Sequence, residues 1–312
     1  MATSNFIIFD GTANPELASA IAGELGVALG PATVTRFPDS EISVTLTGSV
    51  RRKEIFIVQP TSPPVNEHLV ELVAFTDACR RAAAGRITAV VPYFGYSRSD
   101  KRVGRREPIM ARVAADMLQG AGVDHVVTVD LHTPQIEGFF HIPVDSLTAV
   151  QVLCEGLCQR LSPGTMVVAP DAGRVPLATQ YALRLGTPVV VLHKQRESAT
   201  KTEVTHIVGD VRGRPCLVVD DIISTGGTLA SGVEALLDAG ALPEITIAAT
   251  HGLLVDGARE NLSRSGIRDV FVTNTVSMAG KAWPELHVVS VAPLIATAVQ
   301  RFLADGSLSG LF

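Results

Sequence analysis

The chain has 312 residues and a formal net charge of −5; 46% of its residues are hydrophobic and only 5% are aromatic. This length accommodates two domains of ordinary size, the acidic balance argues against a general nucleic-acid-binding protein, and an aliphatic core is typical of parallel α/β sheets. Residues 1–10 lack the features of a secretion signal, and no apolar run reaches the roughly 18 residues of a membrane span, so we predict a cytoplasmic protein without a membrane partner.

Predicted strands and helices alternate along the chain, and the second half repeats the order of the first. The first half has predicted strands at Phe6–Phe9, Ile55–Val58, Ile87–Val91 and Val126–Val129, and helices at Pro15–Leu25 and Glu67–Ala83. The second half has strands at Met166–Ala169, Cys216–Val219, Ile245–Ala249 and Val270–Thr273, with helices at Val175–Leu185 and after Thr228. The repeat predicts an α/β protein of two similar tandem domains, each a doubly wound, mostly parallel sheet flanked by helices.

We predict that the first domain spans residues 1–150 and the second residues 151–292, with Ser162-Pro163-Gly164 leading into the second. The last predicted helix, Pro293–Leu303, is open to packing on either half. Residues 293–312 are therefore candidates to join the first domain.

Two alternating polar and apolar segments enclose the sequence Arg36-Phe37-Pro38-Asp39-Ser40-Glu41. An aromatic ring can stack on a base, and two acids can accept hydrogen bonds from amine or hydroxyl groups. The segment is a candidate ligand contact, and a solvated hairpin tip is the alternative.

Aromatic residues followed by closely spaced cations come after the strand Ile87–Val91. The sequence is Pro92-Tyr93-Phe94-Gly95-Tyr96-Ser97-Arg98-Ser99-Asp100-Lys101-Arg102. This combination suits a purine that carries a polyphosphate. A charged, exposed loop is the alternative.

His132 and Asp171 each follow a predicted strand, in Asp130-Leu131-His132 and Pro170-Asp171-Ala172-Gly173. Open α/β sheets bind ligands at the carboxyl ends of their strands. We therefore interpret the two residues as candidate metal ligands, against the alternative of a structural histidine.

Lys194 and Arg196 follow the predicted strand Val189–Leu192, and the polar segment Glu197–Thr205 after them has little helical or strand periodicity. This pattern favours a mobile flap with two cations near its start. A solvated surface is the alternative.

The most informative stretch is Cys216–Thr228. Its four apolar residues predict a buried strand, which leads into Asp220-Asp221 and then into the turn Ser224-Thr225-Gly226-Gly227-Thr228 before a helix. Backbone N–H groups at a helix N-terminus, with glycines and hydroxyls, bind a phosphate monoester. The two acids suit either a sugar diol or a divalent cation. An ordinary helix N-terminus is the alternative reading.

The first half lacks this pattern at the corresponding place. Its segment Gln59–Pro64 has no acidic pair, and its prolines remove N–H donors. We predict that the first half has kept the scaffold and lost the sugar-phosphate loop.

The stretch Cys216–Thr228 resembles the signature of two families that bind 5-phosphoribosyl 1-diphosphate or ribose 5-phosphate: phosphoribosyltransferases and ribose-phosphate pyrophosphokinases. Nearly the whole chain, from Asn14-Pro15-Glu16-Leu17-Ala18 to Ser309-Gly310-Leu311-Phe312, resembles the second family. That family has Phe-x-Asp-Gly-Glu near Phe37, Tyr-Ala/Ser-Arg-Gln-Asp near Arg98, Asp-Leu-His at His132, Pro-Asp-x-Gly at Asp171 and Lys-x-Arg at Lys194.

The resemblance implies two phosphoribosyltransferase-like domains that transfer the β,γ-diphosphoryl group of MgATP to the 1-hydroxyl of ribose 5-phosphate. It assigns ATP binding to Phe37, Asp39, Ser40, Glu41, Arg98 and Ser99; ribose 5-phosphate binding to Arg196, Asp220, Asp221, Ser224, Thr225, Gly226, Gly227 and Thr228; Mg²⁺ to His132 and Asp171; and catalysis to Lys194 and Arg196. Because the family binds its nucleotide between subunits, a homo-oligomer is implied, as a hexamer.

Three serines depart from the family pattern: Ser40 replaces Gly, Ser99 replaces a nucleotide-contacting Gln, and Ser224 replaces an Asp of the phosphate-regulated members. Two other functions stay open. A phosphoribosyltransferase would consume the diphosphate and release pyrophosphate, and a non-catalytic regulatory homologue would form no AMP.

Overall fold

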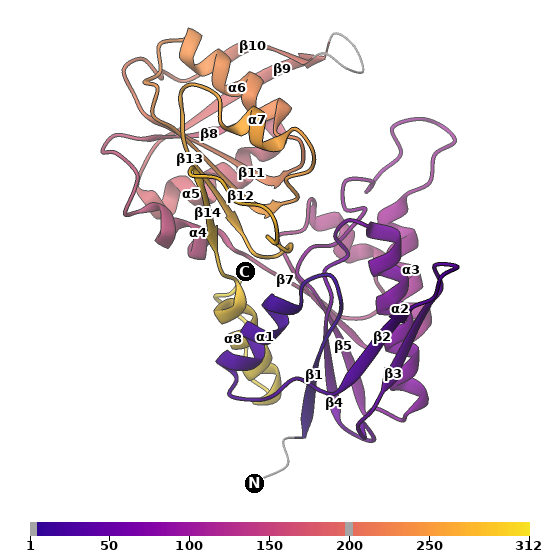
Figure 1. The fold of residues 1–312 in the computed structure, drawn as a ribbon. Coiled ribbons are helices and arrows are strands. Elements are labelled where there is room, and N and C mark those ends of the chain that lie inside the picture. Colours follow the sequence, from indigo (N-terminus) through magenta and orange to yellow (C-terminus); the bar gives the residue numbers. More distant parts are fainter. Residues whose placement is uncertain (1–4, 197–201) are drawn as a thin grey trace. The chain divides into compact units, whose positions relative to one another are not determined.

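The computed structural model describes residues 5–196 and 202–312, and the side chains of residues 194–205 lie outside that description. The described chain divides into two compact units (Figure 1). The first unit contains the residues up to Thr148 together with Thr275–Ser277 and Val291–Phe312, and the second contains Ala149–Asn274 and Met278–Ser290. Both units are α/β, which confirms the predicted fold class.

The first unit is built on a five-stranded parallel sheet. Its strands, in spatial order, are β1 (Phe6–Asp10), β4 (Glu54–Val58), β5 (Arg86–Val91), β6 (His125–Val129) and β7 (Val144–Leu147). A separate antiparallel hairpin is formed by β2 (Ala32–Arg36) and β3 (Ile42–Leu46). The five strands lie side by side in the same order in which they occur along the chain.

Helices cover both faces of this sheet. They are α1 (Pro15–Glu24), α2 (Val65–Arg81), α3 (Met110–Ala121) and α8 (Ala292–Leu303), with a short 3₁₀ helix η1 (Pro134–Phe139). Ile55 and Ile57 pack in one core with Leu72 and Phe75 of α2, while Phe56 between them is also fully buried. Since side chains of a strand alternate between faces, β4 is buried on both. The last helix, α8, packs against α1 and so belongs to the first unit.

The second unit is built on a seven-stranded sheet. Its strands, in spatial order, are β10 (Thr202–Val208), β9 (Val189–Arg196), β8 (Met166–Ala169), β11 (Cys216–Ile223), β12 (Ile245–Gly252), β13 (Ile267–Thr273) and β14 (Leu286–Val289). Only β10 is antiparallel to its neighbour among these strands. From β8 the chain adds β9 on one side and β11 on the other. The winding therefore reverses between β8 and β11, where doubly wound sheets form their binding crevice.

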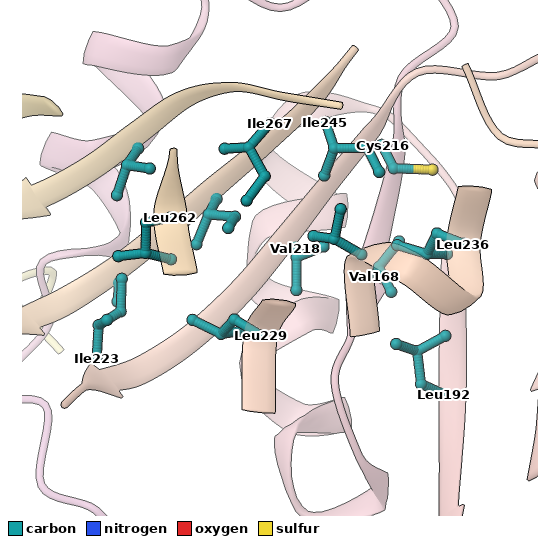
Figure 2. Close-up of a cluster of buried hydrophobic side chains, with 14 of the residues drawn as sticks. Val168, Leu192, Cys216, Val218, Ile223, Leu229, Leu236, Ile245, Leu262 and Ile267 are labelled. Carbon is teal, nitrogen blue, oxygen red and sulfur yellow. The ribbon is translucent and has the colours of Figure 1, made fainter. Parts of the chain in front are cut away.

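Two helical layers enclose the second sheet. The helices are α4 (Val150–Leu157), η2 (Ala172–Arg174), α5 (Val175–Leu185), α6 (Gly227–Asp238) and α7 (Ala258–Leu262). Figure 2 shows the core on one face, where Val168 and Val218 from the strands meet Leu229 and Leu236 from α6. The alternate residues, such as Leu217, are equally buried, and α4 and α5 contact the strands.

Two predicted segments differ from the structure. The segment Glu197–Thr205 was expected to lack regular structure, but from Thr202 it belongs to β10, an edge strand whose polar sequence hides the strand period. The predicted strand Cys216–Val219 continues to Ile223, because β12 is long enough to pair with β11 to its end. Asp220 and Asp221 therefore lie within the strand. Within the described residues, no helix is long and apolar enough to cross a membrane.

Candidate functional site

The winding reversal in the second unit brings together three predicted acids. Asp171 follows β8 and begins η2, where its Oδ1 accepts a hydrogen bond from the Gly173 N–H at 2.9 Å. Asp220 and Asp221 lie on the adjacent strand β11. Because β8 and β11 are neighbours, Asp171 lies at the same end of the sheet as the Asp220-Asp221 motif.

Arg174 contacts both acids of β11, and the sequence did not point to it. Its Nε lies 3.2 Å from Asp220 Oδ1 and its Nη2 lies 3.3 Å from Asp221 Oδ1. The guanidinium is largely buried, with 16% of the side chain exposed. Arg174 follows Asp171 by three residues, but only the order of β8 and β11 in the sheet reveals that it reaches the acidic pair.

The electrostatics of this trio are unbalanced, because two carboxylates share one guanidinium. Burial raises the pKa of Asp220 well above its ordinary value, and the negative charge of Asp221 raises it further. The charge of Arg174 opposes this shift, as does the Asp221 N–H that Asp220 Oδ1 accepts at 2.9 Å. Asp220 is therefore poised to gain a hydrogen-bond donor or a positive charge from a ligand.

The turn after β11 has the backbone of an anion-binding helix start. Gly226 has φ of 73°, a left-handed conformation, and a Cβ there would lie 3.0 Å from the Leu262 side chain, so the position favours glycine on two grounds. Gly226 caps α6 without a side-chain hydrogen bond, and the Gly227 N–H is 3.5 Å from Thr225 Oγ1. The first amides of the helix and the neighbouring hydroxyls suit a phosphate group.

The turn is held in place by the segment that ends in α7. Asn261 Nδ2 donates to the Thr225 carbonyl at 2.8 Å, and the Val255 N–H donates to the Ser224 carbonyl at 3.2 Å. Arg264 in turn donates to Asn261 Oδ1 at 3.0 Å. Asn261 is a second residue that sequence patterns did not identify, because its role depends on a contact between distant segments.

In the first unit, a hydrogen bond connects the segment of Arg98 with that of His132. Asp100 Oδ2 accepts a hydrogen bond from the Thr133 hydroxyl at 2.7 Å. Ser99, a predicted ATP contact, uses its hydroxyl to accept the Met110 N–H at 3.2 Å, at the start of α3. This hydroxyl therefore has a structural role in addition to any contact with a ligand.

The remaining predicted ATP residues lie on the turn between β2 and β3. The Phe37 N–H donates to the Glu41 carbonyl at 2.9 Å and closes the turn, and the Phe37 side chain is 48% exposed. Asp39 Oδ1 accepts the Glu41 N–H at 3.2 Å. An exposed ring and two acids on a hairpin tip are compatible with a ligand contact and with a solvated turn.

Ser40 adopts φ of 76°, so we expect Ser40→Gly to stabilise the protein by roughly 1 kcal/mol, the difference between the left-handed strain and the entropy cost of glycine. Thermal unfolding measures the effect. Ser43→Gly on β3 is the matched control and should destabilise, since the strand backbone there does not need glycine.

The segment Gln59–Pro64 of the first unit differs chemically from the turn after β11. Gln59 is fully buried, accepts the Ala13 N–H at 3.1 Å and donates to the His68 carbonyl at 3.4 Å. A neutral amide paired within the protein thus stands where the second unit has an acidic pair.

The backbones of Lys194 and Arg196 lie on β9, but their side chains fall outside the described part of the chain, as does the segment 197–201. Among the side chains that are described, no three His, Cys, Asp or Glu residues gather in a group able to hold a metal ion.

Known proteins match this chain over nearly its full length. A family model for the N-terminal domain of ribose phosphate pyrophosphokinase matches residues 6–122, and one for the phosphoribosyl synthetase-associated domain matches residues 197–312. The ribose-phosphate pyrophosphokinase of Caldanaerobacter subterraneus subsp. tengcongensis is 44% identical over 99% of this chain and 98% of its own. That of Clostridium perfringens is 42% identical over the same shares.

Among solved structures, the phosphoribosylpyrophosphate synthetase of Mycobacterium smegmatis matches with a TM-score of 0.91 and 42% identity. The match covers 97% of this chain and 100% of that one.

Proposed function

Because the chain belongs to the ribose-phosphate pyrophosphokinase family, we propose that it transfers the β,γ-diphosphoryl group of MgATP to the 1-hydroxyl of ribose 5-phosphate, giving 5-phosphoribosyl 1-diphosphate and AMP. The chain is thus an enzyme, a ribose-phosphate diphosphokinase. The observation that carries the assignment of its sugar site is the acidic pair of β11 running into the glycine turn at the winding reversal.

The acceptor is proposed to bind to the second unit. The amides and hydroxyls of residues 224–228 would hold the 5-phosphate at the start of α6, and Arg196 would add a positive charge. Asp220 and Asp221 would accept hydrogen bonds from the ribose hydroxyls, which supply the donors that the buried acids favour. Arg174 would hold both acids in position through its two contacts with them.

The donor is proposed to bind through residues of the first unit. Phe37 would stack on the adenine, Asp39, Ser40 and Glu41 would contact its polar groups, and Arg98 and Ser99 would address the rest of the nucleotide. The hydrogen bond between Thr133 and Asp100 links the segment of Arg98 to that of His132, which supports a shared role of the two segments in binding the nucleotide and its metal.

Mg²⁺ is the metal that the family implies, and Asp171 offers the kind of ligand that it binds. The Asp171 carboxylate is a hard oxygen ligand, and Mg²⁺ needs few protein ligands where phosphate oxygens and water complete its octahedron. We propose Asp171 and His132 as its protein contacts. When bound, the ion would neutralise charge on the transferred phosphates.

Lys194 and Arg196 are proposed as the catalytic cations. Positive groups near the transferred diphosphoryl group stabilise the charge that spreads over its oxygens. A closed site would also exclude water, which would otherwise hydrolyse ATP.

The experiment that tests the function is detection of AMP from ATP and ribose 5-phosphate with Mg²⁺, with and without inorganic phosphate, and with Mg²⁺ omitted. We expect AMP in proportion to ribose 5-phosphate, and none without the metal. Pyrophosphate release from 5-phosphoribosyl 1-diphosphate and a base would favour a transferase, while no AMP at all would favour a regulatory homologue.

We further propose a cytoplasmic homo-oligomer, hexameric in form, with a first domain of residues 1–150 joined by 293–312 and a second of 151–292. The exposed Phe37 at a hairpin tip supports an oligomer, since it is available to a neighbouring subunit's nucleotide. Sedimentation with activity measured across the gradient is the test, and a fully active monomer would contradict the proposal.

A further inference from the structure

Glu71 of α2 is a fully buried carboxylate with three partners. The Thr12 N–H donates to its Oε1 at 2.7 Å, and the Thr12 hydroxyl donates to its Oε2. Arg36 Nη2 lies 3.6 Å from Oε2. A buried carboxylate is costly unless it is paired and hydrogen-bonded, so the positions of these partners are strongly coupled to it.

Arg36 is the last residue of β2, and Phe37 follows it at the start of the turn. The other guanidinium nitrogen, Nη1, pairs with Glu67, which lies one helical turn before Glu71 and is half exposed. The guanidinium is thus held by a buried acid and by a solvated one. The contact with Glu71 is an ion pair to a carboxylate that solvent does not reach, so it is screened less than the exposed pair with Glu67.

The same end of α2 contacts the other nucleotide segment. Asn66 Oδ1 accepts a hydrogen bond from the hydroxyl of Tyr96, two residues before Arg98. One helix therefore supports both segments to which we assign the nucleotide.

We propose that Glu71 is a positioning residue for the nucleotide: through Arg36 it fixes the base of the β2–β3 turn, so that Phe37, Asp39 and Glu41 are presented in one orientation. The proposal rests on the function proposed above. Glu71 is fully buried and would act through Arg36 rather than by touching the nucleotide, and nothing in its sequence neighbourhood distinguishes it from an ordinary helix residue.

The test is a pair of steady-state titrations, of ATP and of ribose 5-phosphate, on Glu71→Gln. Glutamine keeps the volume and an acceptor for the Thr12 N–H but removes the charge that holds Arg36. We expect the KM for ATP to rise about 10-fold or more, because the substitution removes one partner of an ion pair with a buried carboxylate. The KM for ribose 5-phosphate and kcat should change less than about 3-fold, because the second unit is untouched.

Glu67→Gln is the matched control, since it removes the same charge from the exposed partner of the same guanidinium, and its KM for ATP should change less than about 3-fold. Arg36→Met leaves the bonds from Thr12 to Glu71 in place and should reproduce the ATP-selective effect, even where Glu71→Gln fails to fold. The double variant should be no worse than the worse single variant, as expected for two ends of one contact.

Equal changes for both substrates, an effect of Glu67→Gln as large as that of Glu71→Gln, or additive effects of the two variants would overturn the positioning role. Wild-type protein that forms no AMP would refute the proposed function instead. Active wild type with an unchanged KM for ATP in both Glu71→Gln and Arg36→Met would refute the positioning role alone.

Discussion

Asp220→Asn is expected to make the protein more stable at neutral pH and to lower kcat/KM for ribose 5-phosphate roughly 10- to 100-fold, the range for a lost hydrogen bond to a charged group. The substitution removes one of two buried carboxylates that share a single guanidinium, so Arg174 and Asp221 remain as a balanced pair. The same change removes a charged acceptor from the proposed ribose site. Stability and activity should move in opposite directions, as at other functional sites that carry strain.

The effect of Asp220→Asn on stability should depend on pH, and the direction of the pKa shift of Asp220 gives its sign. In the folded protein the pKa of Asp220 is raised, whereas in the unfolded chain it is ordinary, near 3.9. The folded state therefore binds more protons between those two values, and the wild type loses stability as the pH rises through that window. The Tm advantage of Asp220→Asn should be largest at pH 8 and should shrink toward pH 4.

Thermal unfolding across this range, with kinetics at neutral pH, measures both effects. Glu260→Gln, an exposed acid on α7, is the control and should change neither the Tm nor the kinetics. An Asp220→Asn protein that is less stable at pH 8, or that keeps full activity, would contradict the account of the acidic pair.

Lys194→Ala is expected to lower kcat by on the order of 10²–10³, comparable to the loss of one preorganised group that stabilises charge in the transition state. The Tm should change little. AMP release at saturating substrates is the measurement, and Arg212→Ala, which removes an exposed cation paired with Asp210 in the same unit, is the control for net charge. Turnover equal to wild type would remove Lys194 from the catalytic residues.

Most of the fold could be predicted because buried parallel strands have uninterrupted apolar sequences. The strand Met166–Ala169 and the helix Val175–Leu185 were predicted with the observed bounds. β10 was not predicted, since Thr202–Val208 mixes polar and apolar residues without a clear strand period, although Ile207 packs against the core. Its partner strand, rather than its own sequence, determines its structure.

The candidate site likewise contains residues that the sequence predicts and residues that it does not. Asp220, Asp221 and the glycine turn are one contiguous motif, so their neighbourhood could be predicted before the fold was known. Arg174 and Asn261 act on that motif from other segments, and only strand order and tertiary hydrogen bonds reveal them. Ser99 shows the converse, because a residue predicted to contact the ligand also supports the start of α3.

The last helix closes the first unit, and this has a consequence for synthesis on the ribosome. α8 packs on α1, Phe302 contacts His125 edge to face at 4.7 Å between ring centroids, and the Thr148 N–H donates to the Leu311 carbonyl at 2.9 Å. All residues of the second unit have been translated by Ser290, whereas the first unit is still missing its final layer. The first unit, which is synthesised first, is therefore completed last. A nascent chain halted before residue 291 would leave the apolar side of α1 exposed to chaperones and proteases.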